Sequence, residues 1–106
     1  MDLNLVVLSG RLAASPEIRQ FEDGSILARL LLTIRSEHPR SRIDVVPVTI
    51  WDPPDDLLDP EPAPGERLWV SGAVHRRFWT GAEGRRSRLE VVADQVSRIR
   101  EIAAPR

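Results

Sequence analysis

The sequence predicts a small all-β protein whose strands form a barrel or a sandwich. Three observations support this fold class: about five or six segments have the composition of strands, turn signals separate them, and almost no segment has helical periodicity. The chain has 106 residues, a length that suits one domain with its own hydrophobic core. We therefore expect one domain over residues 1–100 and a short flexible tail over residues 101–106.

The first two expected strands cover residues 3–12 and 18–21. Gly10 lies inside the first of them, which indicates a bulge or a close approach of another backbone segment. Ser15-Pro16 separates the two strands, because proline interrupts a ladder of backbone hydrogen bonds. The residues Glu22-Asp23-Gly24-Ser25 then form a hairpin turn signal.

The next two expected strands cover residues 26–35 and 43–51. In the first of these, the even-numbered positions are all apolar, whereas the odd-numbered positions include Arg29 and Arg35. This period of two predicts one buried face and one half-polar face. The second strand contains Pro47, whose missing N–H places it at a sheet edge, at a bulge, or with its nitrogen pointing outward.

The second half of the chain predicts an irregular segment followed by a long hairpin. Residues 52–65 hold five prolines and leave room for at most one helical turn, near residues 55–58. Strands over residues 67–79 and 86–99 follow, joined by the turn-like sequence TGAEG. Antiparallel pairing of these two strands gives the hairpin.

Charge is distributed unevenly along the chain, although the net charge is only −1. Residues 51–66 carry six acidic residues and no basic one, for −6, whereas residues 67–106 carry nine arginines and four acidic residues, for +5. Residues 1–50 carry six of each kind, so the three segments sum to −1. All fifteen basic residues are arginine, which stacks on planar groups and binds phosphate with two parallel hydrogen bonds. An acidic segment thus masks a basic C-terminal half.

Composition argues against catalysis, metal binding and a membrane span. The chain has no cysteine and two isolated histidines, so neither a disulfide nor a metal site is expected. The acidic residues of the proline-rich segment have no histidine nearby, and no glycine-rich phosphate loop is present. No apolar run is long enough for a signal peptide or a membrane helix. We expect a cytoplasmic protein that uses no cofactor and is not an enzyme.

The sequence HRRFWTGAEGRR, residues 75–86, places Phe78 and Trp79 between pairs of arginines. Adjacent residues in a strand face opposite sides, so both rings cannot enter one core. An exposed aromatic ring among arginines suits the stacking of nucleic-acid bases, with phosphates held nearby. The alternative is a cation–π contact that only stabilises the hairpin. Arg86 and Arg88 share one face, where they form either a charged stripe for binding or a solvated surface.

The other three aromatic residues admit a structural role as well as a functional one. Trp69 lies in a dense apolar strand, where core packing or a subunit interface is the expected role. Trp51 precedes two prolines and either packs on them or is available for stacking. Phe21 ends a short strand beside a turn, and its position favours neither packing nor function.

Residues 6–34, VVLSGRLAASPEIRQFEDGSILARLLLTI, resemble the N-terminal half of bacterial single-stranded DNA-binding proteins, the SSB family. The likeness rests on a strand that ends in G-x-L, on the segment Ser15-Pro16-Glu17-Ile18-Arg19, and on a following strand from Ala28 to Leu32. Further along, GERLWVSGAVHRRFW is similar to a family strand with two glycines, an arginine and a tryptophan. The corresponding residues here are Gly65, Gly72, Arg77 and Trp79. The segment VVADQVSRI is similar to the closing strand of the family.

The resemblance implies an OB-fold, a five-stranded barrel with a long hairpin between its last two strands. It also implies sequence-tolerant binding of single-stranded DNA in replication, recombination or repair, in association with the nucleoid, and a homo-oligomer, either a tetramer or a dimer. Trp79 and Trp51 fall where the family stacks bases, and Arg77 and Arg19 fall at basic positions that meet phosphates. The full expected interface comprises Trp51, Trp79, Phe78, Arg19, Arg35, Arg77, Arg86 and Arg88.

Departures from the family pattern leave alternatives open. Residues 44–46 stand where the family usually has a tryptophan with polar neighbours, and Pro47 replaces a position that is often basic. No glycine-rich linker or acidic tail follows the last strand, so replication or repair proteins are not expected to bind through such a tail. One alternative is a primosomal accessory protein similar to PriB, which acts mainly through protein partners and binds DNA weakly. The other is a purely structural barrel with its aromatic residues in an oligomer interface.

Overall fold

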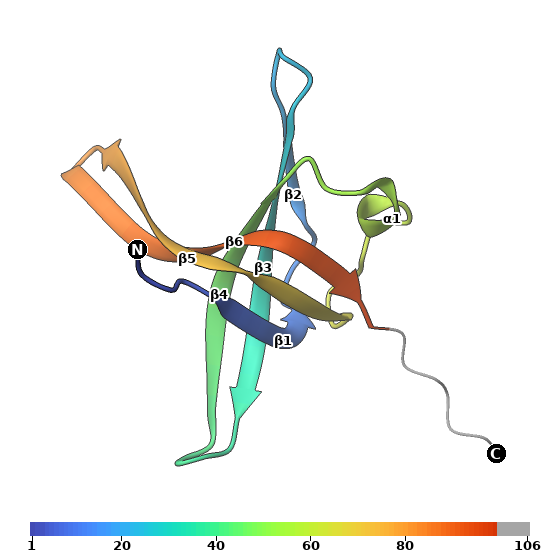
Figure 1. Ribbon diagram of the computed structural model, residues 1–106, viewed down its shortest axis with the longest axis vertical. Helices are drawn as coiled ribbons and strands as arrows, with labels where there is room; N and C mark the ends of the chain where they lie inside the picture. Colours follow the sequence, from blue (N-terminus) through green and yellow to red (C-terminus); the bar gives the residue numbers. More distant parts are fainter. Residues whose placement is uncertain (100–106) are drawn as a thin grey trace.

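The computed structural model describes residues 1–99, which form six strands and one short helix (Figure 1). In chain order these are β1 (Val6–Leu12), β2 (Glu17–Gln20), β3 (Ile26–Ser36), β4 (Arg42–Trp51), α1 (Asp55–Leu58), β5 (Arg67–Gly81) and β6 (Gly84–Arg98). The expected strands are all present, and the single helical turn lies where the proline-rich segment leaves room for it. The tail expected over residues 101–106 lies outside the described residues.

The strands form one sheet that closes into a barrel (Figure 1). Their order is β1-β5-β6-β4-β3-β2, and a further pairing between β1 and β3 completes the ring. β1 and β2 lie one after the other along β3, with Leu12 opposite Leu32 and Glu17 opposite Arg29. The expected five-stranded barrel is therefore confirmed, and its first strand is interrupted around Pro16 and counted here as two.

The barrel interior holds the hydrophobic core. Leu30 and Leu32 are buried while Leu31 between them is exposed, as the period of two predicts. Each fully buried leucine contributes roughly 1.5–3 kcal/mol to stability. The buried cluster comprises Leu12, Ala28, Leu30, Leu32, Val48, Ile50, Leu57, Leu68, Val70, Val91, Ala93 and Val96. Core packing is the wrong interpretation for Trp69, because this side chain faces outward and is 36% exposed.

Two glycines allow neighbouring strands to approach closely. A Cβ atom on Gly10 would lie 2.5 Å from the carbonyl oxygen of Thr33, where β1 crosses β3. A Cβ atom on Gly72 would lie 2.1 Å from the carbonyl oxygen of Val92, beside a register shift between β5 and β6. Both distances are far below normal contact, so only glycine fits at these positions. The close approach expected at Gly10 is confirmed.

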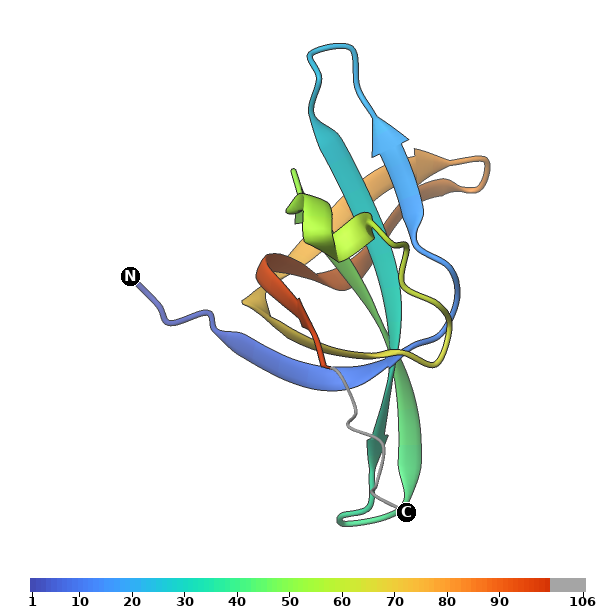
Figure 2. The same cartoon turned by 90° about the vertical axis from the view of Figure 1, so that its right-hand side faces the viewer.

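Hairpins project from the barrel in different directions (Figures 1 and 2). The β5–β6 hairpin extends well beyond the core and turns over Ala82 and Glu83, with Gly84 at a φ of 108°. The β3–β4 hairpin projects from another side of the barrel (Figure 2). Within the described residues, no helix is long and apolar enough to cross a membrane.

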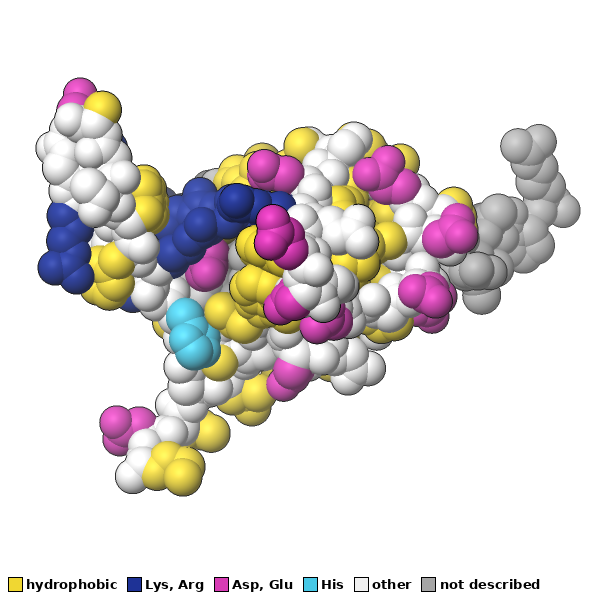
Figure 3. Space-filling model, turned by 90° about the horizontal axis from the view of Figure 1, so that it is seen from above, with side chains coloured by type: hydrophobic (Ala, Val, Ile, Leu, Met, Phe, Trp, Pro, Cys, Tyr) yellow, Lys and Arg dark blue, Asp and Glu magenta, His cyan; other side chains and the backbone are white. Residues whose placement is uncertain are grey.

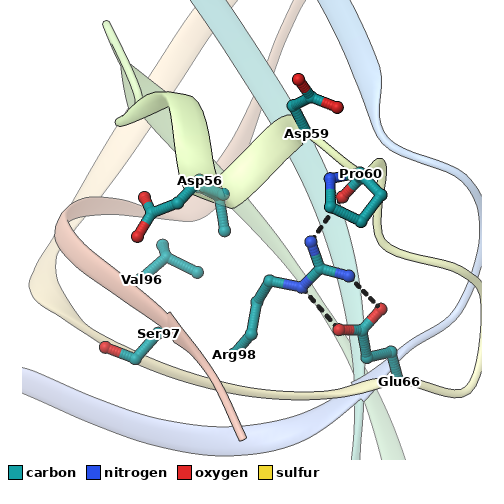
Figure 4. Close-up of a pocket in the computed structure, with 8 residues that line it drawn as sticks. Asp56, Asp59, Pro60, Glu66, Val96, Ser97 and Arg98 are labelled. Carbon is teal, nitrogen blue, oxygen red and sulfur yellow. Dashed lines mark hydrogen bonds and ion pairs between the residues drawn. The ribbon is translucent and has the colours of Figure 1, made fainter. Parts of the chain in front are cut away.

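The acidic proline-rich segment is tied to the end of β6 by Arg98 (Figure 4). The guanidinium donates from Nε to Glu66 Oε1 at 2.6 Å and from Nη2 to Glu66 Oε2 at 2.9 Å. It also donates to the carbonyl oxygen of Pro60. The three bonded residues line a pocket of about 400 Å³, to which Asp56 and Asp59 also contribute. This partly buried arginine thus helps to hold the acidic segment against the barrel, together with Leu57 in the core.

Candidate nucleic-acid interface

The outer face of the barrel carries polar and aromatic side chains in rows that run across three strands. Arg19 of β2 lies opposite Leu27 of β3, which lies opposite Trp51 of β4. The neighbouring row contains Arg29 and Thr49. These side chains alternate along the strands with core residues, so they point away from the core.

A groove of about 200 Å³, here called the Trp51 groove, opens on this face. Five strands or their ends contribute to it, because the barrel brings β2, β3 and β4 beside the base of the β5–β6 hairpin. Its lining includes Arg19, Phe21, Arg29, Trp51, Arg77 and Glu90. Three of the residues expected from the sequence, Arg19, Trp51 and Arg77, therefore meet in one place.

Trp51 and Phe21 form the aromatic wall of the Trp51 groove. Their ring centroids are 5.5 Å apart and their planes are tilted by 30°. Trp51 remains 50% exposed, so part of its ring stays open to a ligand. The guanidinium carbon of Arg19 lies 5.2 Å from the centre of the Phe21 ring, within cation–π distance. Trp51 thus packs on Phe21. The sequence favoured neither packing nor function for this phenylalanine, and the structure places it in the candidate site.

The β5–β6 hairpin separates Phe78 from Trp79. Trp79 lies opposite Arg86, and two residues before it Arg77 lies opposite Arg88, so these four side chains share one face. Phe78 lies on the other face, where the guanidinium carbon of Arg85 is 4.8 Å from its ring centre. The expectation that the two rings face opposite sides is confirmed. The cation–π contact weighed for this hairpin is present at Phe78.

Arg29 connects the Trp51 groove to a second depression of about 240 Å³. It lines both, and Arg88 lines the second one. Seen from above, arginine side chains form a band between the projecting β5–β6 hairpin and the body of the barrel (Figure 3). Such a band gives this face a positive potential that suits a phosphate backbone.

Comparison with a family model identifies the family of this chain. The model of the single-strand binding protein family matches residues 3–99. The chain belongs to this family. Two curated relatives are single-stranded DNA-binding protein 1 of Nostoc sp., 28% identical over 80 residues, and the single-stranded DNA-binding protein of Oceanobacillus iheyensis, 29% identical over 99 residues. The first match covers 76% of this chain and 67% of the relative, and the second covers 89% and 62%.

A solved structure shares the fold of this family member. It is described as a Plasmodium falciparum SSB complex with ssDNA, and it matches with a TM-score of 0.81 at 20% sequence identity. The match covers 94% of this chain and 97% of the other. This likeness confirms the OB-fold. The family assignment does not favour the primosomal accessory protein as an alternative.

Arg35 is an expected residue that the fold places in a different groove. It lines a separate groove of about 470 Å³ with Arg11, Arg67 and Ile43, and none of these lines the Trp51 groove. Sequence alternation puts Arg35 and Arg29 on the same polar face of β3, but six positions separate them along this 11-residue strand, so they have different surroundings. Arg29, which no sequence pattern distinguishes from Arg35, is the one that lines the groove with the aromatic wall.

Proposed function

We propose that this chain binds single-stranded DNA across the Trp51 groove and the adjoining face of the β5–β6 hairpin, in replication, recombination or repair. The observation that carries the proposal is the meeting of a half-exposed tryptophan with Arg19, Arg29 and Arg77, which come from three different strands. Aromatic platforms with arginines beside them are what sequence-tolerant binding of single strands requires. The activity is binding without a catalytic step.

Stacking supplies the first part of the proposed affinity. Trp51 and Trp79 are both exposed, at 50% and 39%, and each offers a ring to a base. A stacked base contributes roughly 1–3 kcal/mol, so two platforms contribute about 2–6 kcal/mol. Phe21 supports Trp51 from behind, whereas Phe78 is assigned to the opposite hairpin face and contacts only DNA that passes around the hairpin.

Phosphate contacts supply the second part. Arg19, Arg77 and Arg88 line the grooves through which the strand would pass, and Arg86 lies beside Trp79 on the hairpin. Each neutralised phosphate releases counterions, which makes affinity fall with salt. Arg35 is proposed to contact DNA only where a longer strand continues to its separate groove.

We further propose a homo-oligomer, a dimer or a tetramer, built on the free edge of β1. This strand pairs with β5 along Val6 to Arg11 but with β3 only at Arg11 and Leu12, so within residues 1–99 one edge of its first half has no strand partner. Leu5 and Val7 are 64% and 54% exposed beside this edge. An open strand edge with exposed apolar side chains is a surface that a second chain can cover.

The DNA-binding proposal is tested by titrating the chain with an oligo-dT of about 35 nucleotides, longer than a single OB-fold site, while tryptophan fluorescence is followed. The chain has three tryptophans and no tyrosine, so the signal comes from the proposed platforms and from Trp69. Strong quenching is expected, with a log–log salt slope of about −0.7 for each phosphate contact. If the oligonucleotide neither quenches the fluorescence nor binds the protein at low salt, the proposal is overturned.

A further inference from the structure

Glu90 of β6 is an acidic residue in a groove otherwise dominated by arginines. It lines the Trp51 groove and is only 9% exposed. Its Oε2 atom is buried and has no hydrogen-bond partner within residues 1–99. Buried carboxylate oxygens are normally hydrogen-bonded, because an unpaired one loses its hydration without compensation. An unpaired oxygen inside a groove therefore indicates a position where a ligand donates the missing hydrogen bond.

A second unpaired atom belongs to another residue that lines this groove. The Nε–H donor of Arg29 is buried and also has no partner in the described part of the chain. Two residues that line the groove beside Trp51 thus each hold a buried unsatisfied atom, an acceptor on Glu90 and a donor on Arg29. A ligand that satisfies both must carry a hydrogen-bond donor for Glu90 and an acceptor for Arg29, on a flat group that can stack on Trp51.

Phosphate does not meet this requirement, because a phosphate has only acceptor oxygens and is repelled by a carboxylate. The edge of a nucleobase does meet it. Cytosine and adenine each carry an amino group next to a ring nitrogen that accepts a hydrogen bond, and acidic side chains accept from the cytosine amino group. Thymine places a carbonyl oxygen on each side of its single N–H, so an approaching carboxylate is repelled from both sides.

We propose that Glu90 selects amino-bearing bases over thymine at the base position stacked on Trp51. Glu90 Oε2 accepts a hydrogen bond from the amino group, and Arg29 Nε donates to the neighbouring ring nitrogen. This inference rests on the proposed binding of single-stranded DNA and adds a base preference to it. The other base positions have no such acceptor assigned and remain sequence-tolerant.

The test compares oligo-dC with oligo-dT of the same length, for the unaltered chain and for Glu90→Gln. Loss of the negative charge raises affinity for any DNA, so the measured quantity is the ratio of the two dissociation constants at one salt concentration. The ratio is expected to move toward dT by about fivefold or more in Glu90→Gln, the lower range of one base-edge contact. An unchanged ratio would overturn the inference.

Glu17→Gln is the matched control, since Glu17 is exposed, lies opposite Arg29 on β2 and lines the second depression on the proposed DNA path but not the Trp51 groove. It removes one negative charge from the same face, so both affinities should rise together and their ratio should stay constant. A shift of the ratio equal to that of Glu90→Gln would assign the effect to charge alone and overturn the inference.

A measurement on the unaltered chain covers the case in which Glu90→Gln fails to fold. Oligo-dC is compared with an oligonucleotide in which each cytosine lacks its amino group, so that stacking area and phosphates are kept. Binding weaker by about fivefold is expected for the altered oligonucleotide, and equal binding would overturn the inference.

If the chain binds no oligonucleotide at low salt, the proposed function fails together with this inference. If it binds all of them equally, the inference fails alone.

Discussion

Trp51 packs on Phe21 with 5.5 Å between the ring centroids, although 30 positions separate the two residues in the sequence. Two hydrogen bonds between Asp52 and Ile26 stabilise this arrangement. The Asp52 N–H donates to the carbonyl of Ile26 at 2.7 Å, and its Oδ1 accepts from the Ile26 N–H at 2.9 Å. Asp52 has a φ of 48°, a left-handed conformation uncommon outside glycine. The paired hydrogen bonds compensate for that backbone and fix the last residue of β4 over the turn that begins at Phe21.

This relationship predicts the effect of removing the exposed ring. Trp51→Ala should weaken binding of oligo-dT by about 1–3 kcal/mol, because one stacking platform is lost. Trp51→Phe keeps a ring in place and should recover most of that loss. Dissociation constants at one salt concentration, measured by fluorescence anisotropy of a labelled oligonucleotide, provide the comparison. Equal affinities for Trp51→Ala and the unaltered chain would remove Trp51 from the interface.

Arg77 predicts a change in salt dependence rather than in stacking. It lines the Trp51 groove from β5, and its replacement in Arg77→Gln should reduce the log–log salt slope by about 0.7, the amount for one phosphate on a single strand. Arg40, exposed in the loop between β3 and β4, provides the control. Arg40→Gln should leave the slope unchanged. The same slope for Arg77→Gln and the unaltered chain would contradict a phosphate contact at Arg77.

Replacing the neighbours Trp79 and Phe78 with alanine should lower DNA affinity by different amounts. Trp79 shares its hairpin face with Arg77, Arg86 and Arg88, so Trp79→Ala should weaken binding by about 1–3 kcal/mol. Phe78 faces the other side and contacts Arg85, so Phe78→Ala should change affinity for a short oligo-dT far less. The dissociation constants of both variants for the same oligonucleotide, measured by titration, show which ring contacts DNA. A larger loss in Phe78→Ala would place the DNA on the opposite hairpin face.

The sequence predicted the strands because the information for each strand is local, whereas the choice of a barrel over a sandwich came from the resemblance to the SSB family. Alternation in residues 26–35, the proline run after Trp51 and the turn after Trp79 each determine an element without reference to the rest of the chain. The site depends on which outer faces meet after the barrel closes, and periodicity alone does not contain that. Arg29 and Arg35 have the same pattern, yet only Arg29 reaches Trp51. Glu90 was overlooked for a related reason, since one acidic residue in a basic hairpin gives no signal of its burial.

Gly72 predicts a stability effect that is independent of DNA. In Gly72→Ala the new methyl group would meet the backbone carbonyl of Val92 at 2.1 Å, so β5 and β6 must separate. Overpacking of this kind costs about 1–3 kcal/mol or more in the free energy of unfolding. Gly24→Ala is the control: its φ of 91° is strained for alanine, but no atom lies within 4 Å of the added methyl group. Urea unfolding should show the larger loss for Gly72→Ala, and the reverse order would contradict the close approach.

The free edge of β1 predicts how the oligomer can be dissociated. Val7 is 54% exposed, and a charge in Val7→Asp would be desolvated if a second chain covered this edge. The variant should therefore elute at the mass of a single 11.9 kDa chain in size exclusion with light scattering, while the unaltered chain elutes at a multiple of it. Val45→Asp is the control, because Val45 is similarly exposed, at 58%, on β4, which β3 separates from β1. If Val45→Asp dissociates the oligomer and Val7→Asp does not, the interface lies on the β3–β4 hairpin instead. If the unaltered chain is a monomer, the oligomer proposal is wrong.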